Sequence, residues 1–160
     1  MEYIENAKAE FLQAKEGMIK ALTTTPDERI NWAPSPTART PIQQVAHSAA
    51  SIGHITGMLM GNPFAVPTPE EADKGFREWE QQFANRAEVL ELLNQNSDAF
   101  ITWLDSVTPE QLNTLVTLPF SLGTAPIQAM LSAPTLHTRF HTAQMEYMQT
   151  IYGDQDWHLS

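Results

Sequence analysis

One stretch decides the fold: TPIQQVAHSAASIGHITGMLM, residues 40–60. Thr40 is a good helix N-cap, Pro41 suits the first helical position, and Gln43 stands where a capping box places Glu or Gln. From Ile42 to Met60 the residues carry no formal charge and are apolar, small or hydroxylated nearly all round. The pattern therefore predicts a helix that is buried on more than one side, which requires other helices to pack around it.

The segments before and after this stretch also favour helices. A first amphipathic helix ends near Thr23, because apolar residues recur at spacings of three and four, namely Ile4, Ala7, Phe11, Ala14, Met18 and Leu22. A long connection with three prolines, TTTPDERINWAPSPTAR, separates it from residues 40–60. After a second proline-rich connection, GNPFAVPTPEE, an apolar stripe predicts a third helix from about residue 70 to 106, with a potential interruption in the polar segment 94–97.

The last third of the chain begins with a short helical turn at 108–112 and the non-helical segment TLVTLPFSLG, in which residues 115–120 favour a short extended piece. Thr124 is the expected N-cap of a fourth helix that runs to Tyr152 and ends at Gly153, and Pro134 should kink or break it. No other run alternates apolar and polar residues. These patterns predict an all-α fold, an up-down four-helix bundle, with residues 1–160 as a single domain.

The composition excludes several classes of protein. Nine Lys and Arg against 19 Asp and Glu give a net charge of −10, which repels nucleic acid and anionic lipid surfaces. There is no cysteine, so a metal would have to bind to His, Asp or Glu. The N-terminus lacks the unbroken apolar stretch of a signal peptide, and no window reaches membrane-spanning length. We therefore expect a soluble, cytoplasmic protein with no nucleic-acid or membrane partner.

The histidines are the residues most suited to chemistry. His137 and His141 are four residues apart, which places them one turn apart on a helix face that otherwise points into the bundle. They form either half of a metal site or a pair that only donates to carbonyl or hydroxyl groups. His47 and His54 share a face of the second helix, but about 10.5 Å of rise separates them, so at most one can join the pair. His158 lies in the C-terminal tail and is expected to be solvated.

The order of these features resembles the DinB/YfiT-like superfamily of metal-dependent enzymes. The specific matches are the Trp-x-Pro of Trp32-Ala33-Pro34, the TPIQQVAH segment, and the HxxxHxxQ pattern of HTRFHTAQ. The chain departs from the family in having Thr142-Ala143 where Arg-Gly is frequent before the glutamine, and Ser132 or Ala133 in place of a further histidine of some members.

The resemblance implies a divalent metal ion on His47, His137 and His141, with Gln144 matching the glutamine of the pattern. Zinc, nickel, iron and manganese all suit such a site. The ion would activate a water or a low-molecular-weight thiol for hydrolysis or transfer on a small-molecule substrate, and the resemblance also suggests a homodimer. His54, Tyr147 and Glu146 are candidate acids or bases by their proximity along the helices. The alternative is a non-catalytic metal-binding or stress-response bundle in which the metal is structural or vestigial.

Overall fold

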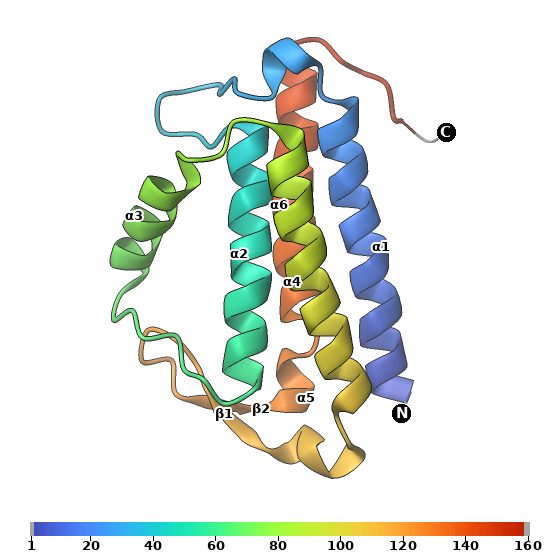
Figure 1. Ribbon diagram of the computed structural model, residues 1–160, viewed down its shortest axis with the longest axis vertical. Coiled ribbons are helices and arrows are strands. Elements are labelled where there is room, and N and C mark those ends of the chain that lie inside the picture. The colour runs from blue at the N-terminus through green and yellow to red at the C-terminus, as the bar shows by residue number, and fades with distance from the viewer. Residues whose placement is uncertain (1, 159–160) are drawn as a thin grey trace.

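A computed structural model describes residues 2–158, and four long helices form its bundle (Figure 1). These helices are α1 (Glu2–Thr24), α2 (Pro41–Leu59), α4 (Arg86–Ser106) and α6 (Ala133–Ile151). The connections contain the helices α3 (Pro69–Glu80) and α5 (Ile127–Met130), the 3-10 turns η1 (Asp27–Arg29) and η2 (Pro109–Asn113), and the strands β1 (Leu115–Thr117) and β2 (Thr124–Pro126). The predicted all-α four-helix bundle is confirmed.

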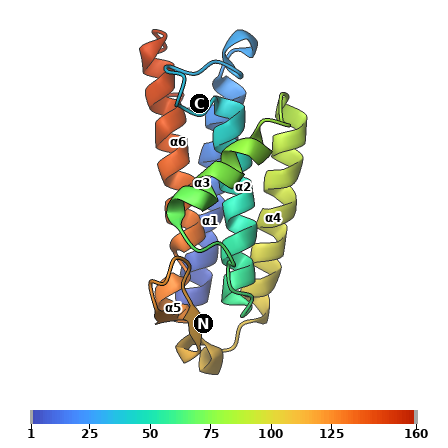
Figure 2. The same cartoon turned by 90° about the vertical axis from the view of Figure 1, so that its left-hand side faces the viewer.

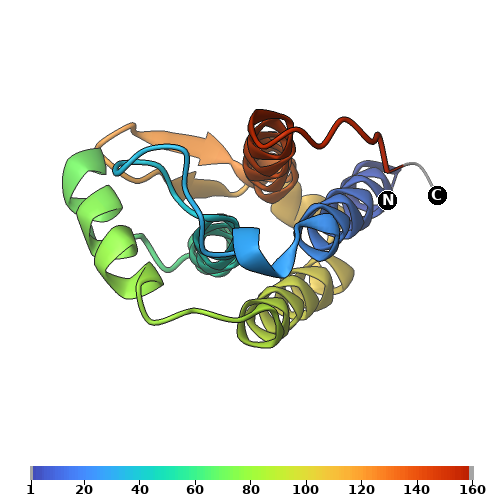
Figure 3. The ribbon, with the colours of Figure 1, turned by 90° about the horizontal axis from the view of Figure 1, so that it is seen from above.

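Helices α2 and α4 run in the same direction, and α1 and α6 run in the opposite one (Figure 1). Ion pairs at both ends fix the antiparallel arrangement of α1 and α4, because Lys8 binds Asp105 at 2.6 Å and Arg86 pairs with Asp27 just beyond α1. Seen along the bundle, α1 lies diagonally opposite α2, and α4 lies diagonally opposite α6 (Figure 3). Along the chain the direction therefore reverses from α1 to α2 and again from α4 to α6, but not from α2 to α4.

The reason for the parallel pair is α3, which carries the chain back toward the end where α2 begins (Figure 2). The prediction of one helix over 70–106 is wrong at this point: it is two helices separated by residues 81–85. Asn85 is extended and its side chain accepts a hydrogen bond from the Glu88 amide at 3.0 Å, so it caps a new helix. The polar segment 94–97, where an interruption was expected, remains helical.

The predicted helix ends are otherwise close to those observed. The capping box at Thr40 is formed, with the Gln43 amide donating to the Thr40 hydroxyl at 3.2 Å. Thr124 does not cap a helix, because it lies in β2, where the register pairs Val116 with Ala125. Pro134 lies in the first turn of α6 and separates it from α5, and Gly153 ends α6 with a φ of 96°.

The apolar core lies between the four long helices. At its centre the rings of Phe11 and Phe100 pack edge to face, with centroids 4.8 Å apart. The α2 side chains facing this core are fully buried: Ile42, Val45, Ala49 and Ile52. No helix within residues 2–158 combines the length and apolar character that crossing a membrane requires. The core leaves the opposite face of α2 free to build a site with α3 and α6.

Candidate metal centre

Three histidines converge where α2 and α6 pack against each other. A nitrogen of His47 on α2 lies within 4.8 Å of nitrogens of His137 and His141 on α6, and these three form a cluster of potential metal ligands. The face of His47 is opposite the core-facing stripe of α2. It can serve a site only because α2 packs on two sides, against the core and against α6.

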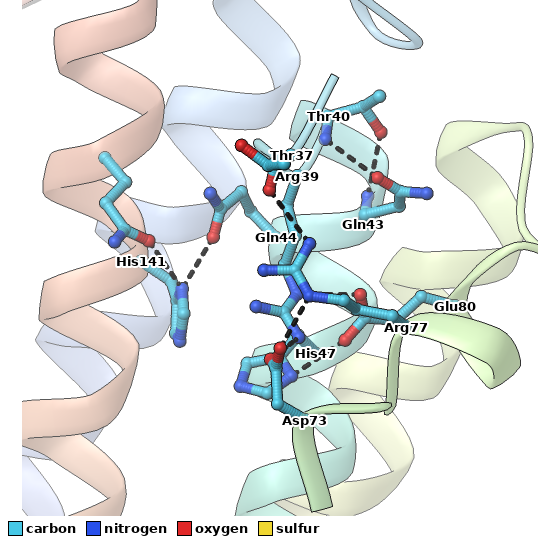
Figure 4. Close-up of polar contacts among 11 residues, drawn as sticks. Thr37, Arg39, Thr40, Gln43, Gln44, His47, Asp73, Arg77, Glu80 and His141 are labelled. Carbon is cyan, nitrogen blue, oxygen red and sulfur yellow. Dashed lines mark hydrogen bonds and ion pairs between the residues drawn. The ribbon is translucent and has the colours of Figure 1, made fainter. Parts of the chain in front are cut away.

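A chain of polar contacts that begins at the buried carboxylate of Glu80 orients His47 (Figure 4). Its Nδ1 lies 2.8 Å from Oε1 of Glu80, whose other oxygen accepts a hydrogen bond from Arg39 Nε at 2.7 Å. Arg39 also donates to Asp73 at 2.8 Å, and Asp73 accepts from Arg77 at 2.6 Å. A carboxylate can only accept, so Nδ1 of His47 donates this hydrogen bond, and Nε2 is the ring nitrogen left to bind a metal ion.

His141 is oriented by two amides. Its Nδ1 lies 2.6 Å from the side-chain oxygen of Gln44 and 2.8 Å from that of Gln144 (Figure 4). Because amide oxygens accept hydrogen bonds, this nitrogen carries the proton and Nε2 carries the lone pair. Gln144, the glutamine of the HxxxHxxQ pattern, therefore fixes the orientation and tautomer of a histidine one turn away.

The environment of His137 indicates whether these residues fit a cation. Its Nε2 is buried and has no hydrogen-bond partner among residues 2–158. A buried polar atom without a partner is costly, and a cation shared with two neighbouring imidazoles would remove that cost. Burial, with a smaller repulsion from His47, lowers the pKa of His137 to about 4. Burial likewise lowers the pKa of His141 to about 3. Both imidazoles are thus neutral at pH 7, the form that binds a metal.

A cavity of about 360 Å³ opens beside the histidine cluster. His47 and His137 lie in its wall, and the other lining residues are mainly apolar: Ile55, Met58, Phe64, Pro69, Ala72, Phe76, Pro119, Phe120, Met130 and Ala133. His54 also lines the cavity, with its ring 4.7 Å from Phe64 and 5.5 Å from Phe76. Desolvation by these surroundings lowers the pKa of His54. A small molecule in this cavity would contact His54 and the histidine cluster together.

The other candidate residues lie away from this cavity. Tyr147 points outward from α6 with its side chain 68% exposed. Glu146 is exposed and lines a different cavity, next to the C-terminal tail. His158 is not simply solvated, because its Nε2 lies 3.1 Å from Asp154 in the same tail. The structure therefore brings His54 to the site but neither Tyr147 nor Glu146.

Sequence reasoning missed Glu80, Arg39 and Gln44. Glu80 is 33 residues from His47, and nothing in the surrounding run FREWEQQ distinguishes it from the exposed Glu78. Only one signal was available for Gln44: it lies in the same capped segment as His47. Contacts this distant in sequence depend on how α3 returns along the bundle, which local patterns do not encode.

Comparison with known proteins identifies the family and the fold of the chain. The family model of the DinB superfamily matches residues 10–145. Among solved structures, YfiT from Bacillus subtilis, described as a probable metal-dependent hydrolase with an unusual four-helix bundle topology, superposes with a TM-score of 0.74 and 17% sequence identity, over 94% of this chain and 87% of that one. An uncharacterized protein from Clostridium difficile 630 has a TM-score of 0.73 and 13% identity, over 92% of this chain and 96% of that one.

A protein from Streptococcus pneumoniae has a TM-score of 0.71 and 15% identity, over 92% of this chain and 91% of that one. At these identities the likenesses establish the fold alone. No curated protein matches the sequence. The family match covers most of the chain, including two of the bundle's long helices in full, α2 and α4, and all three clustered histidines. The chain therefore belongs to the DinB superfamily.

Proposed function

We propose that this protein is a metal-dependent hydrolase in which His47, His137 and His141 hold a divalent ion through their Nε2 atoms. The observation that carries the proposal is the buried Nε2 of His137, which has no partner within residues 2–158 and belongs to a cluster with two imidazoles already oriented by other side chains. Three neutral ligands leave coordination positions open, as catalytic sites require. That YfiT is described as a probable metal-dependent hydrolase supports the same chemistry.

When bound, a divalent ion at this position would act as a Lewis acid and lower the pKa of a water molecule toward about 7. The chain's own contribution is to hold the ligands in place. Glu80 accepts the Nδ1 proton of His47, and Arg39 neutralises the buried carboxylate from its other side. The side-chain oxygens of Gln44 and Gln144 likewise accept the Nδ1 proton of His141, and these two side chains are uncharged.

His54 is the proton acceptor we propose for the reaction. It lies in the wall of the same cavity as His47 and His137, and its lowered pKa keeps the imidazole neutral and able to take up a proton at pH 7. The rings of Phe64 and Phe76 hold it at the cavity's edge. Its position two turns along α2 leaves room for a substrate between it and the three ligands.

The cavity favours a small, apolar substrate without negative charge. Of the described residues that line it, Asp73 carries the only formal charge when the histidines are neutral, and none is a lysine or an arginine. Apart from a bound ion, the lining residues offer an anionic substrate no opposite charge, because Asp73 is negative and already paired with Arg39 and Arg77. An aromatic or aliphatic group would instead contact Phe64, Phe76 and Phe120. This argument favours water over an acidic low-molecular-weight thiol as the co-reactant.

The test uses untagged protein, either metal-free or loaded with zinc, nickel, iron or manganese. Hydrolysis of phenyl esters of a short aliphatic acid is compared with hydrolysis of the same esters carrying an added carboxylate. We expect turnover of the uncharged ester in the loaded protein only, and a loss of about a hundredfold in His54→Ala at unchanged metal content. His158→Ala is the matched control and should behave as wild type.

Equal turnover in metal-free protein and in His137→Ala would overturn the proposal. Release of product only when a low-molecular-weight thiol is added would replace hydrolysis by thiol transfer. A preference for the carboxylated ester would contradict the substrate class derived from the cavity.

A further inference from the structure

A second cavity, of about 500 Å³, is lined by residues of α2, α3 and α4. In the view along the bundle, α3 stands apart from α4 on this side of the molecule (Figure 3). The second cavity shares His54, Phe64, Ala72 and Phe76 with the first one, but no member of the histidine cluster lines it. The two cavities therefore adjoin at these four residues, and only the first reaches the histidine cluster.

The acidic side chains of the two cavities differ in their partners. Among the residues that the structure describes, each cavity is lined by one formally charged side chain when the histidines are neutral, Asp73 in the first and Glu71 in the second. Asp73 accepts hydrogen bonds from Arg39 and Arg77, which compensate its charge. Glu71 forms no ion pair within the described part of the chain, and its Oε2 accepts only from the Thr68 hydroxyl, at 3.3 Å. The second cavity therefore presents an uncompensated negative charge.

Aromatic rings line the second cavity together with this carboxylate. Phe64 and Phe76 are nearly parallel, with an angle of 18° between their planes and centroids 6.2 Å apart. Trp79 lies one turn after Phe76 on α3, and its ring packs edge to face against Phe83 at 4.8 Å. The faces of aromatic rings attract cations, and that of tryptophan does so most strongly. Aromatic rings beside an unpaired carboxylate are typical of sites for organic ammonium groups.

Two glycines and an amide shape the same cavity. A Cβ at Gly53 would lie 3.2 Å from the Asn96 amide nitrogen, so the missing side chain lets Asn96 reach α2 and donate to Ala49 at 2.8 Å. This contact leaves Oδ1 of Asn96 to accept a hydrogen bond from a ligand. A Cβ at Gly75 would meet no atom within 4 Å, because this position borders the cavity. The polar groups of the cavity wall are thus suited to a ligand that is positively charged or donates hydrogen bonds.

We propose that the second cavity binds an organic ammonium group, quaternary or protonated, which Glu71 and the rings of Phe76 and Trp79 hold. The net charge of −10 attracts such cations from a distance. An extension of this proposal, which rests on the proposed function, is that the substrate itself carries the ammonium group. Its reacting bond then lies beside the histidine cluster in the first cavity, and its ammonium group lies on the other side of His54.

The first test measures binding to metal-free protein, so its result does not depend on the hydrolase activity. Choline and its uncharged analogue, in which a tert-butyl group replaces the trimethylammonium group, are titrated by isothermal calorimetry. We expect choline to bind at least about tenfold more tightly. Glu71→Gln should weaken choline binding about tenfold, although glutamine also suits the capping position that Glu71 occupies at the start of α3. Glu70→Gln, at the adjacent exposed position, is the matched control and should bind as wild type.

The location of the site is tested by filling the cavity. Gly75→Leu adds a side chain where there is space for it and should abolish choline binding, with circular dichroism as the control for folding. Gly57→Leu is the matched control, because Gly57 is also helical and has free space at its Cβ position but does not line the cavity. Unchanged choline binding in Gly75→Leu would overturn the location. Equal affinities of wild type for choline and its uncharged analogue would overturn the ligand class.

The extension to the substrate is tested with metal-loaded protein and the phenyl esters of two acids of the same shape, one ending in a trimethylammonium group and one in a tert-butyl group. We expect KM to be about tenfold lower for the ammonium ester, and Glu71→Gln to remove this preference. Equal KM values for the two esters in wild type would overturn the extension. Choline binding without turnover of either ester would support the ammonium site and contradict the hydrolase activity, so the two proposals can fail separately.

Discussion

The two faces of α2 differ in polarity and in the elements that they contact. One face, with Ile42, Val45 and Ile52, is fully buried in an apolar core that needs no ion or ligand. The other face, with His47 and His54, meets polar side chains from α3 and α6 and the wall of a cavity. The difference indicates that one face of the helix stabilises the fold and the other face forms the proposed site. A substitution on one face should therefore leave the property of the other face unchanged.

The largest expected effect is on metal binding. His137→Ala or His141→Ala should abolish stoichiometric binding of a divalent ion, because two imidazoles remain, while the helices stay formed. Metal analysis after dialysis measures the bound metal, and circular dichroism on the same samples measures the helix content. Full metal occupancy in both variants would remove α6 from the ligand set. Unfolding of the metal-free wild type at pH 7.5 would mean that the site is structural, as in the non-catalytic alternative.

The complementary change is on the core face. Ile52→Ala should lower the free energy of unfolding by about 2–5 kcal/mol, because it leaves a cavity in a tightly packed core, yet metal stoichiometry should not change. Its neighbour Ser51 lines the cavity of the site, so Ser51→Ala is the matched variant and should cost less. Urea unfolding measures the free energies. Loss of metal from Ile52→Ala in its folded state would show that the two faces are not independent.

A smaller effect on metal affinity is expected when Glu80, which orients His47, is changed. Glu80→Gln keeps the shape of the side chain but removes the charge that holds the Nδ1 proton, so metal affinity should fall about 10- to 100-fold. Glu78→Gln, on the same helix but exposed, is the control. Competition titration with a chelator measures the affinities. Equal affinities in the two variants would reduce Glu80 to a purely structural partner of Arg39.

The last expected effect concerns the pH dependence of stability in the metal-free protein. Burial holds the pKa of His137 near 4 and that of His141 near 3, against about 6.5 in the unfolded chain. Between about pH 6.5 and 4 the unfolded chain therefore binds more protons, and the free energy of unfolding falls as the pH is lowered. Each histidine contributes about 1.4 kcal/mol per pH unit in this window. Urea unfolding of His141→Asn should show a correspondingly shallower fall, and an identical slope would argue against this burial.

The sequence patterns were sufficient for the parts of the molecule that depend on local chemistry. The capping box at Thr40, the break before Pro134 and the end at Gly153 are each encoded within a few residues. The convergence of His137 and His141 follows from helical spacing alone. The addition of His47 rested on the family resemblance, and the structure brings it to the other two.

The parts that the sequence could not supply depend on long-range packing. The apolar stripe of residues 70–106 continues across the break at 81–85, so periodicity alone joins α3 to α4. With that break missed, α3 could not be placed over the cavity, and Glu80, Asp73 and Phe76 could not be assigned to the site. Tyr147 and Glu146 were candidates because they follow His141 in sequence, but a helix turns such neighbours onto other faces.

The most direct test of the central claim is diffraction from crystals of untagged protein, with data collected above and below the absorption edge of the metal found by elemental analysis. The account predicts one anomalous peak per chain, within about 2.0–2.2 Å of Nε2 of His47, His137 and His141, with an open position toward the cavity that His54 lines. A peak on other residues would contradict it. So would an empty histidine cluster in crystals grown with excess metal at pH 7.5.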